Sequence, residues 1–166
     1  NCFNRITSLT FDLTSENGVG DEVLSLFMPS LKSLRELVIL NNMSNQNKLT
    51  PKGACLVSTL NNLLVLDISG NNLGDEGISW ISRMANLSKL NISSNKLTDV
   101  GVSKLSKLTC LSELNVGWNK FGEQGCSAIS NITTLRSLNL VNVHVGNNSI
   151  RSICHISRLK KLYICT

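Results

Sequence analysis

The sequence predicts an α/β fold built as a solenoid, in which strand–helix units stack on one another. The first observation is a fixed period of 24 residues. Similar sequence segments begin at Leu63, Leu87, Leu111, Leu135 and Leu159. The second is the alternation of polar and apolar residues early in each unit, which indicates a short, half-buried strand. The third is apolar spacing by three later in the unit, which indicates a short helix. Such a period is typical of stacked units.

Seven units can be counted along the 166 residues, starting near Ile6, Leu34, Leu63, Leu87, Leu111, Leu135 and Leu159. The first copy is degenerate. Leu34 precedes Leu63 by 29 residues, and we interpret the polar stretch 43–48 as an insertion at a turn. The repeats leave no room for a boundary between independent cores, so residues 1–166 are predicted to form a single domain. The last unit stops directly after its strand, which suggests a part of a longer protein.

The second half of each unit predicts a helix with one buried side. Its apolar residues are 78, 81 and 84, then 102, 105 and 108, then 126, 129 and 132, and finally 150, 153 and 156. A strand followed by a helix in every unit predicts parallel strands joined by right-handed crossovers. Helices are wider than the strand spacing. We therefore expect a right-handed horseshoe with the strands on its concave face and the helices on its convex face.

Glycine recurs just before each helical half, at positions 53, 77, 101 and 125. This repetition indicates either a special backbone conformation or a close approach that a side chain would obstruct. Asp75 and Asp99 precede two of these glycines, where a negative charge suits the positive end of a helix dipole.

The units resemble the leucine-rich repeat family, whose pattern L-x-x-L-x-L-x-x-N is matched by Leu87-Ser-Lys-Leu90-Asn-Ile92-Ser-Ser-Asn95. The resemblance implies a structural ladder in which the last asparagine bonds to backbone groups, here Asn42, Asn71, Asn95 and Asn119. Val143 takes this slot in the sixth unit, so we expect a weaker ladder there, with residues 146–148 forming a departing loop. The long second half is similar to the ribonuclease-inhibitor and GALA types, the latter including proteins that bacteria deliver into host cells.

The predicted concave face is the candidate partner-binding surface. Its residues are Glu36, Val38, Asp67, Ser69, Lys89, Asn91, Glu113, Asn115, Asn139, Lys161 and Tyr163, with Trp118 beside them. Tryptophan is enriched among the residues that dominate binding energy at protein interfaces, which makes Trp118 a candidate anchor. The alternative is that Trp118 only covers the turn at the end of its strand.

Catalysis is not expected, because no motif brings together a nucleophile, a base and an oxyanion donor. Cys154 and His155 are neighbours in a helical segment and point about 100° apart. Asp67 with Lys89 is the nearest approach to a titratable cluster, and an ordinary ion pair explains it. With two histidines and no clustered cysteines, neither a metal site nor a cofactor is expected.

Composition and charge restrict the kinds of partner that we expect this chain to bind. The net charge is +5, with basic residues concentrated at positions 151, 158, 160 and 161. We interpret them as solubilising charge, the alternative being a patch for an anionic partner. Aromatic residues make up 4%, too few for stacking on nucleic-acid bases, and no apolar run reaches the length of a membrane span. None of the six cysteines forms a Cys-x-x-Cys pair, so we expect reduced thiols and a cytoplasmic location, or the host cytosol for a delivered protein.

The function predicted from these observations is a protein–protein interaction module without catalysis. The alternative is the substrate-recognition part of a larger ubiquitin-ligase adaptor, or a bacterial effector. The partner is another protein, with neither nucleic acid nor membrane insertion involved. An uncapped end of the stack would also allow self-association.

Overall fold

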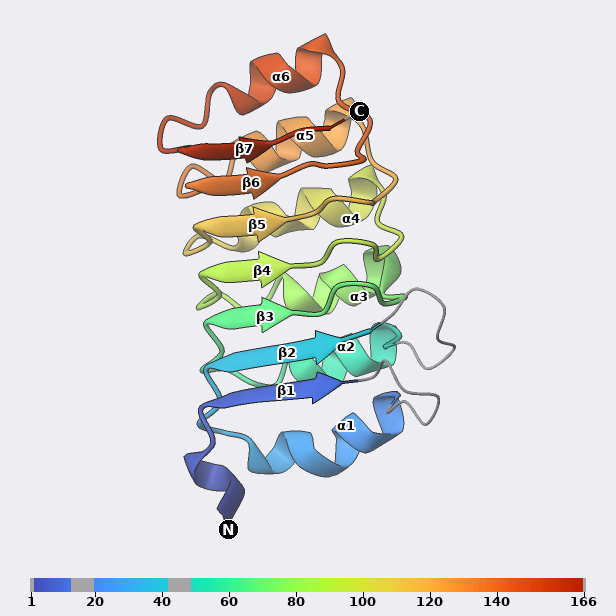
Figure 1. Ribbon diagram of the computed structural model, residues 1–166, viewed down its shortest axis with the longest axis vertical. Coiled ribbons are helices and arrows are strands. Elements are labelled where there is room, and N and C mark those ends of the chain that lie inside the picture. The colour runs from blue at the N-terminus through green and yellow to red at the C-terminus, as the bar shows by residue number, and fades with distance from the viewer. Residues whose placement is uncertain (1, 13–19, 42–48, 166) are drawn as a thin grey trace.

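The computed structural model describes residues 2–12, 20–41 and 49–165. Its strands form one parallel sheet in which sequence order and spatial order are the same, so each strand pairs with the next one along the chain (Figure 1). The strands are β1 (Ser8–Asp12), β2 (Glu36–Leu40), β3 (Val65–Asp67), β4 (Lys89–Asn91), β5 (Glu113–Asn115), β6 (Ser137–Asn139) and β7 (Lys161–Tyr163).

Short helices connect the strands. The α-helices are α1 (Asp21–Phe27), α2 (Pro51–Val57), α3 (Gly74–Ile81), α4 (Asp99–Ser103), α5 (Glu123–Ser130) and α6 (Asn147–Ile153). Three 3₁₀ turns are η1 (Cys2–Arg5), η2 (Met28–Ser30) and η3 (Lys104–Lys107). The apolar spacing by three is compatible with both α and 3₁₀ geometry. The fourth repeat uses both, since the 3₁₀ turn η3 continues directly from α4.

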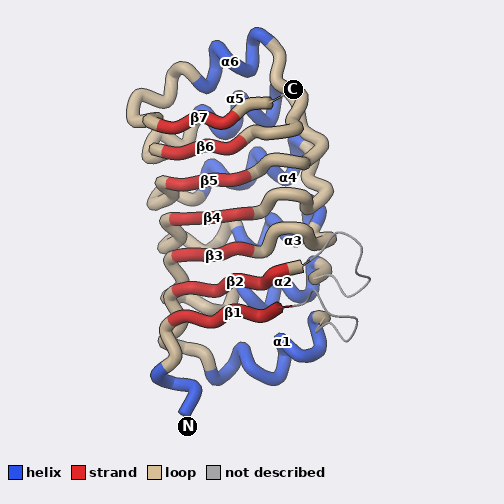
Figure 2. Tube along the Cα trace, in the orientation of Figure 1, coloured by secondary structure: helices blue, strands red, loops and turns tan. Residues whose placement is uncertain are grey.

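The helices form a single layer behind the sheet, and the opposite face of the sheet is left open (Figure 2). The described chain is therefore a solenoid of strand–helix units, as predicted. The degenerate first copy also forms its strand, because Ser8 and Leu9 of β1 stand opposite Glu36 and Leu37 of β2. We call the open side of the sheet the strand face.

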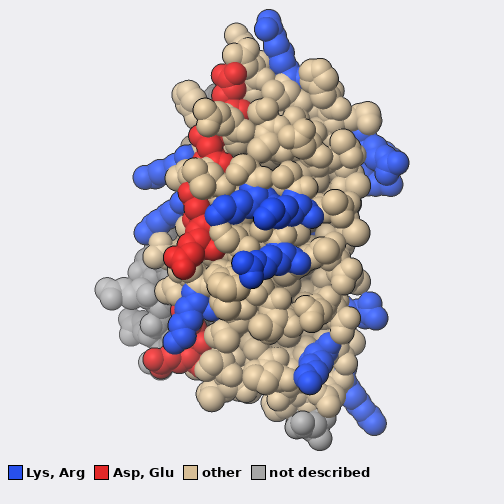
Figure 3. Space-filling view, turned by 180° about the vertical axis from the view of Figure 1, so that it is seen from behind, with Lys and Arg blue, Asp and Glu red and all other residues tan. Residues whose placement is uncertain are grey.

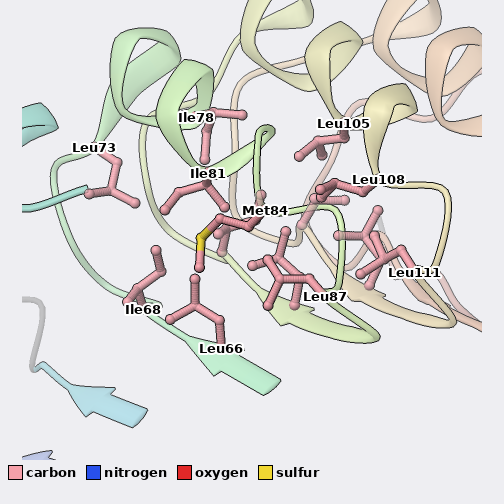
Figure 4. Close-up of a cluster of buried hydrophobic side chains, with 14 of the residues drawn as sticks. Leu66, Ile68, Leu73, Ile78, Ile81, Met84, Leu87, Leu105, Leu108 and Leu111 are labelled. Atoms are coloured by element: carbon pink, nitrogen blue, oxygen red, sulfur yellow. The ribbon is translucent and has the colours of Figure 1, made fainter. Parts of the chain in front are cut away.

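Aliphatic rows shared by successive coils form the core. Leu66, Leu90 and Leu114 are register partners on neighbouring strands, and each is almost fully buried. Ile68, just after β3, lies below Ile81 at the end of α3, with Met84 between the strand and helix layers (Figure 4). Each coil thus covers the apolar side of its neighbours. A single coil of this length could not bury that side by itself, so the coils are stable only when stacked.

The recurrent glycines are sites of close approach. A Cβ on Gly101 would overlap Oδ1 of Asp75 from the preceding coil and would lie 3.0 Å from the Asp75 Cα atom. The Asp75 carboxylate accepts hydrogen bonds from Thr98 N at 2.9 Å and from Thr98 Oγ1 at 2.6 Å. In the same way Asp99 Oδ1 accepts from the backbone N–H of Gly125 at 2.6 Å. These two aspartates therefore tie the start of α3 to that of α4 and the start of α4 to that of α5.

One local prediction is corrected by the structure. Residues 146–148 do not form a departing loop, because α6 begins at Asn147 and Gly146 lies before it in extended backbone at φ −92°. The residue in the asparagine slot, Val143, is buried. Apolar burial there substitutes for the polar ladder, and the strand–helix unit continues.

The β7 end of the sheet exposes apolar surface. Leu162 stands opposite the fully buried Leu138 in register, yet 40% of its surface is exposed. Ile150 on α6 is 37% exposed.

Candidate functional site

Strand register aligns the candidate residues into two rows across the strand face. One row runs through Glu36, Val65, Lys89, Glu113, Ser137 and Lys161, and the other through Val38, Asp67, Asn91, Asn115, Asn139 and Tyr163. We call the second one the amide row. These side chains come from six different coils, and only the stacking of the repeats brings them together.

A shallow hollow of about 260 Å³ lies over the middle of this face. Members of both rows line it: Val65, Asp67, Lys89, Asn91, Glu113, Asn115, Ser137, Asn139 and Tyr163. Among the residues predicted for the partner surface, Glu36, Val38, Ser69, Trp118 and Lys161 lie outside this hollow. Sites for small molecules normally bury more than about two-thirds of the ligand's surface. This hollow is too open to enclose a small molecule in that way.

Four residues of the amide row share one turn at the ends of their strands. Their side-chain oxygen accepts a hydrogen bond from the backbone N–H two residues on: Asp67 from Ser69 at 3.0 Å and Asn115 from Gly117 at 3.1 Å. The same bond joins Asn91 to Ser93 at 3.2 Å and Asn139 to Val141 at 2.9 Å. Because a backbone N–H can only donate, this contact fixes which side-chain atom is the oxygen. The NH₂ group of each asparagine is then available for other contacts.

The expected ion pair between Asp67 and Lys89 is wrong. Lys89 Nζ instead lies 2.9 Å from Glu113 Oε1, its direct partner on β5, and both side chains are about half exposed. The second oxygen of Asp67 accepts from Asn91 Nδ2 at 2.8 Å. A residue directly opposite on the neighbouring strand is closer than a diagonal one, so the direct pair forms.

Trp118 combines exposure with an unfavourable backbone conformation. Its side chain is 56% exposed, and its φ is +57°, in the left-handed region. The backbone is held there by a hydrogen bond from Trp118 N to Val141 O of the next coil, at 2.8 Å. The equivalent residues Gly70, Ser94 and Asn142 also have positive φ, which glycine and asparagine tolerate best. A bulky residue in this slot is an outlier.

The ladder asparagines lie inside the solenoid, away from the strand face. Asn71, Asn95 and Asn119 are buried. The amide of Asn95 donates to Ile68 O at 2.9 Å, and that of Asn119 donates to Ile92 O at 3.0 Å, so both reach the preceding coil. Asn71 Oδ1 accepts from Leu49 N at 2.9 Å. Asn42, predicted to join them, lies outside the described residues. Their geometry is that of fold-holding groups, and we propose that role.

The helix side carries charged groups in a different arrangement. Acidic residues in the first turns of α1, α3, α4 and α5 contribute to a red column along the edge where the helices begin (Figure 3). Trp80 packs partly against the core, with the Arg83 guanidinium carbon 4.4 Å from its ring centroid. This contact accounts for Trp80 as a packing residue of the helix layer.

Other reactive side chains are separated from the strand face or held by the backbone. His155 Nδ1 lies 2.7 Å from Arg151 O, so that nitrogen donates to a carbonyl within its own helical turn. Cys126 is fully buried, and burial raises the pKa of its thiol. Within residues 2–12, 20–41 and 49–165, no three His, Cys, Asp or Glu side chains gather as a metal-binding group. The strand face therefore offers hydrogen bonding and charge pairing, which are means of recognition.

Sequence reasoning found the rows of the strand face and missed two properties of their residues. It did not show that the turns use the asparagine oxygens. Nor did it show the strain at Trp118, although Gly70 and Asn142 in the same slot were a usable sign of left-handed backbone.

Comparison with known proteins agrees with the fold. Residues 61–121 match the family model described as "Leucine rich repeat". Among solved structures, an internalin from Listeria monocytogenes is similar over 98% of this chain, with a TM-score of 0.70 and 21% sequence identity. This chain spans 49% of the length of that internalin chain. Comparison with curated proteins gave no match. Residues 61–121 therefore carry leucine-rich repeats, and the described chain has the fold of a leucine-rich repeat solenoid.

Among the described helices, none has both the length and the apolar character needed to cross a membrane.

Proposed function

We propose that this solenoid is a protein-recognition module that binds a partner protein on its strand face and performs no catalysis of its own. The helix layer covers one side of the sheet, and the strand face presents two rows of mostly polar side chains from six coils. Its extent suits a protein surface better than a small metabolite. Repeat solenoids commonly bind through such extended surfaces.

The observation that carries the proposal is the conformation of Trp118. Left-handed backbone costs an ordinary residue about 1–2 kcal/mol, and a large exposed indole adds little burial in return. The equivalent positions hold Gly70, Ser94 and Asn142, so a tryptophan is not needed to make this turn. Strained residues of this kind gather at functional sites. An exposed tryptophan at the end of β5 is suited to anchor a partner.

The narrower alternatives are an adaptor of a ubiquitin ligase and a bacterial effector. Both would combine this same recognition surface with a second activity located elsewhere. The proposal therefore covers the step that they share, which is the binding of a partner protein.

Replacing Trp118 by asparagine separates binding from folding. Asparagine tolerates positive φ, as Asn142 shows in the next coil, so we expect Trp118→Asn to unfold at equal or higher denaturant, with a gain of up to about 1 kcal/mol. Binders selected on the wild-type chain from a displayed library of protein fragments should lose at least about tenfold in affinity for the variant, as for an interface anchor.

The opposite pattern would contradict the proposal. If Trp118→Asn lowers stability and leaves the affinity of every selected fragment unchanged, Trp118 only covers its turn. The matched control is Trp80→Phe on the helix side, which should leave fragment binding unchanged.

A further inference from the structure

The part of the strand face formed by β5, β6 and β7 presents hydrogen-bond donors that lack partners among the described residues. On Asn115 and Asn139 the side-chain oxygen is occupied by the turn N–H of Gly117 and Val141. Neither NH₂ group has an acceptor among the described residues, and both side chains are partly exposed. Each therefore directs unpaired donors to the solvent.

The neighbouring residues on these strands add to the donor character. Tyr163 is the register partner of Asn139 and is 50% exposed. Lys161, the partner of Ser137, is exposed, and its ammonium group has no ion pair within the described chain. The one carboxylate on these strands, Glu113, is paired with Lys89. This end of the face consequently carries an uncompensated positive charge.

The earlier coils differ from this arrangement. The side-chain oxygen of Asn91 also accepts a hydrogen bond from a turn N–H, but its NH₂ group donates to Asp67 at 2.8 Å. Donor and acceptor therefore satisfy each other on β3 and β4. The open donors begin at β5, so the two halves of the amide row should favour different partners.

We infer that β5, β6 and β7 form the part of the strand face that recognises an acidic segment of the partner protein, in which carboxylates and backbone carbonyls supply the missing acceptors. This inference rests on the proposed function and adds the chemistry of the bound segment. Hydrogen bonds that involve a charged group are stronger than neutral ones, and donors left unpaired under a bound partner would oppose binding. A basic or purely apolar segment would offer only its backbone carbonyls as acceptors, and a basic segment would also be repelled by Lys161.

A substitution of asparagine by aspartate tests the donor role with little change to the fold. Asp67 already makes the same turn with a carboxylate oxygen, so Asn115→Asp and Asn139→Asp should keep their bonds to Gly117 and Val141. Each change replaces an outward NH₂ donor by a charged oxygen. Ser127→Asp places the same charge on an exposed position of α5 in the helix layer and serves as the matched control.

The experiment selects peptides from a displayed random library on the folded chain and measures their affinity for each variant by fluorescence anisotropy. We expect the selected peptides to be enriched in Asp and Glu and to bind more weakly as salt is raised. Asn115→Asp and Asn139→Asp should each weaken them by at least about tenfold, with unchanged unfolding midpoints, whereas Ser127→Asp should not.

The other outcomes are distinguishable. Peptides that are basic or uncharged, and that are weakened by Trp118→Asn, would overturn the inference while the strand face remains the binding surface. Peptides that bind Trp118→Asn, Asn115→Asp and Asn139→Asp as tightly as the wild type would overturn both proposals. A library that yields no enriched peptide would also overturn the inference, because an open donor surface should retain acidic segments.

Discussion

Asn119 makes five hydrogen bonds to backbone groups, all inside the solenoid. Its amide donates to the carbonyls of Ile92, Val116 and Gly117, at 3.0, 2.9 and 3.2 Å. Its oxygen accepts from the N–H groups of Asn95 and Leu97, at 2.9 and 3.0 Å. One side chain thus serves backbone polar groups of two successive coils where water is excluded.

Truncation of this side chain should destabilise the fold strongly. Asn119→Ala leaves two buried N–H groups without an acceptor, and we expect the free energy of unfolding to fall by about 2–3 kcal/mol. Denaturant unfolding measures the change. Asn72→Ala removes an exposed asparagine side chain and should stay close to the wild type. Equal stability of the two variants would show that the asparagine ladder does not hold the coils together.

For single residues, the sequence predicted which side chains form the polar strand face better than it predicted their backbone conformation. The alternation that defines the strands also identifies the residues of the strand face, because successive side chains point to opposite sides. Backbone dihedrals and hydrogen-bond partners depend on the adjacent coil. The strain at Trp118 and the occupied oxygens of Asn115 and Asn139 could therefore be seen only once the coils were stacked.

At the scale of elements, the starts of α4 and α5 are each positioned by a carboxylate from the coil before them. Asp75 contacts the Thr98 N-cap of α4, and Asp99 contacts the first turn of α5. Sequence reasoning assigned these aspartates to the dipole of their own helix. The contact to the next helix was missed because a 24-residue separation gives no local sign of proximity.

Gly101→Ala tests this packing. The added Cβ would overlap the Asp75 side chain and approach its backbone, so we expect a loss of about 1–3 kcal/mol in the free energy of unfolding, as for overpacked cores. Gly146→Ala is the matched control, since φ there is −92° and no atom lies within 4 Å of the new Cβ. The loss in Gly101→Ala should be smaller in an Asp75→Ala background. A loss of the same size in Gly146→Ala would refute the close-approach explanation.

For the whole molecule, the period in the sequence was sufficient to predict the architecture. Equal steps between Leu63 and Leu159 require equal coils, and equal coils place equivalent residues in register across the sheet. The period does not determine partner chemistry, because that depends on how the variable positions pair with one another. Lys89 bonds to Glu113 and Asn91 to Asp67, which leaves the open donors concentrated at β5, β6 and β7.

Self-association through an end of the stack stays a prediction. Leu162 on β7 is 40% exposed, whereas its register partner Leu138 on β6 is fully buried.

The two tryptophans allow a direct test of which side binds, since Trp118 lies at the end of β5 and Trp80 in the helix layer. The chain labelled with ¹⁵N at both indoles gives two resonances, which Trp118→Asn assigns. When a selected fragment is added, the Trp118 resonance should shift or broaden while the Trp80 resonance stays in place. A shift of Trp80 with Trp118 unmoved would contradict recognition through the strand face.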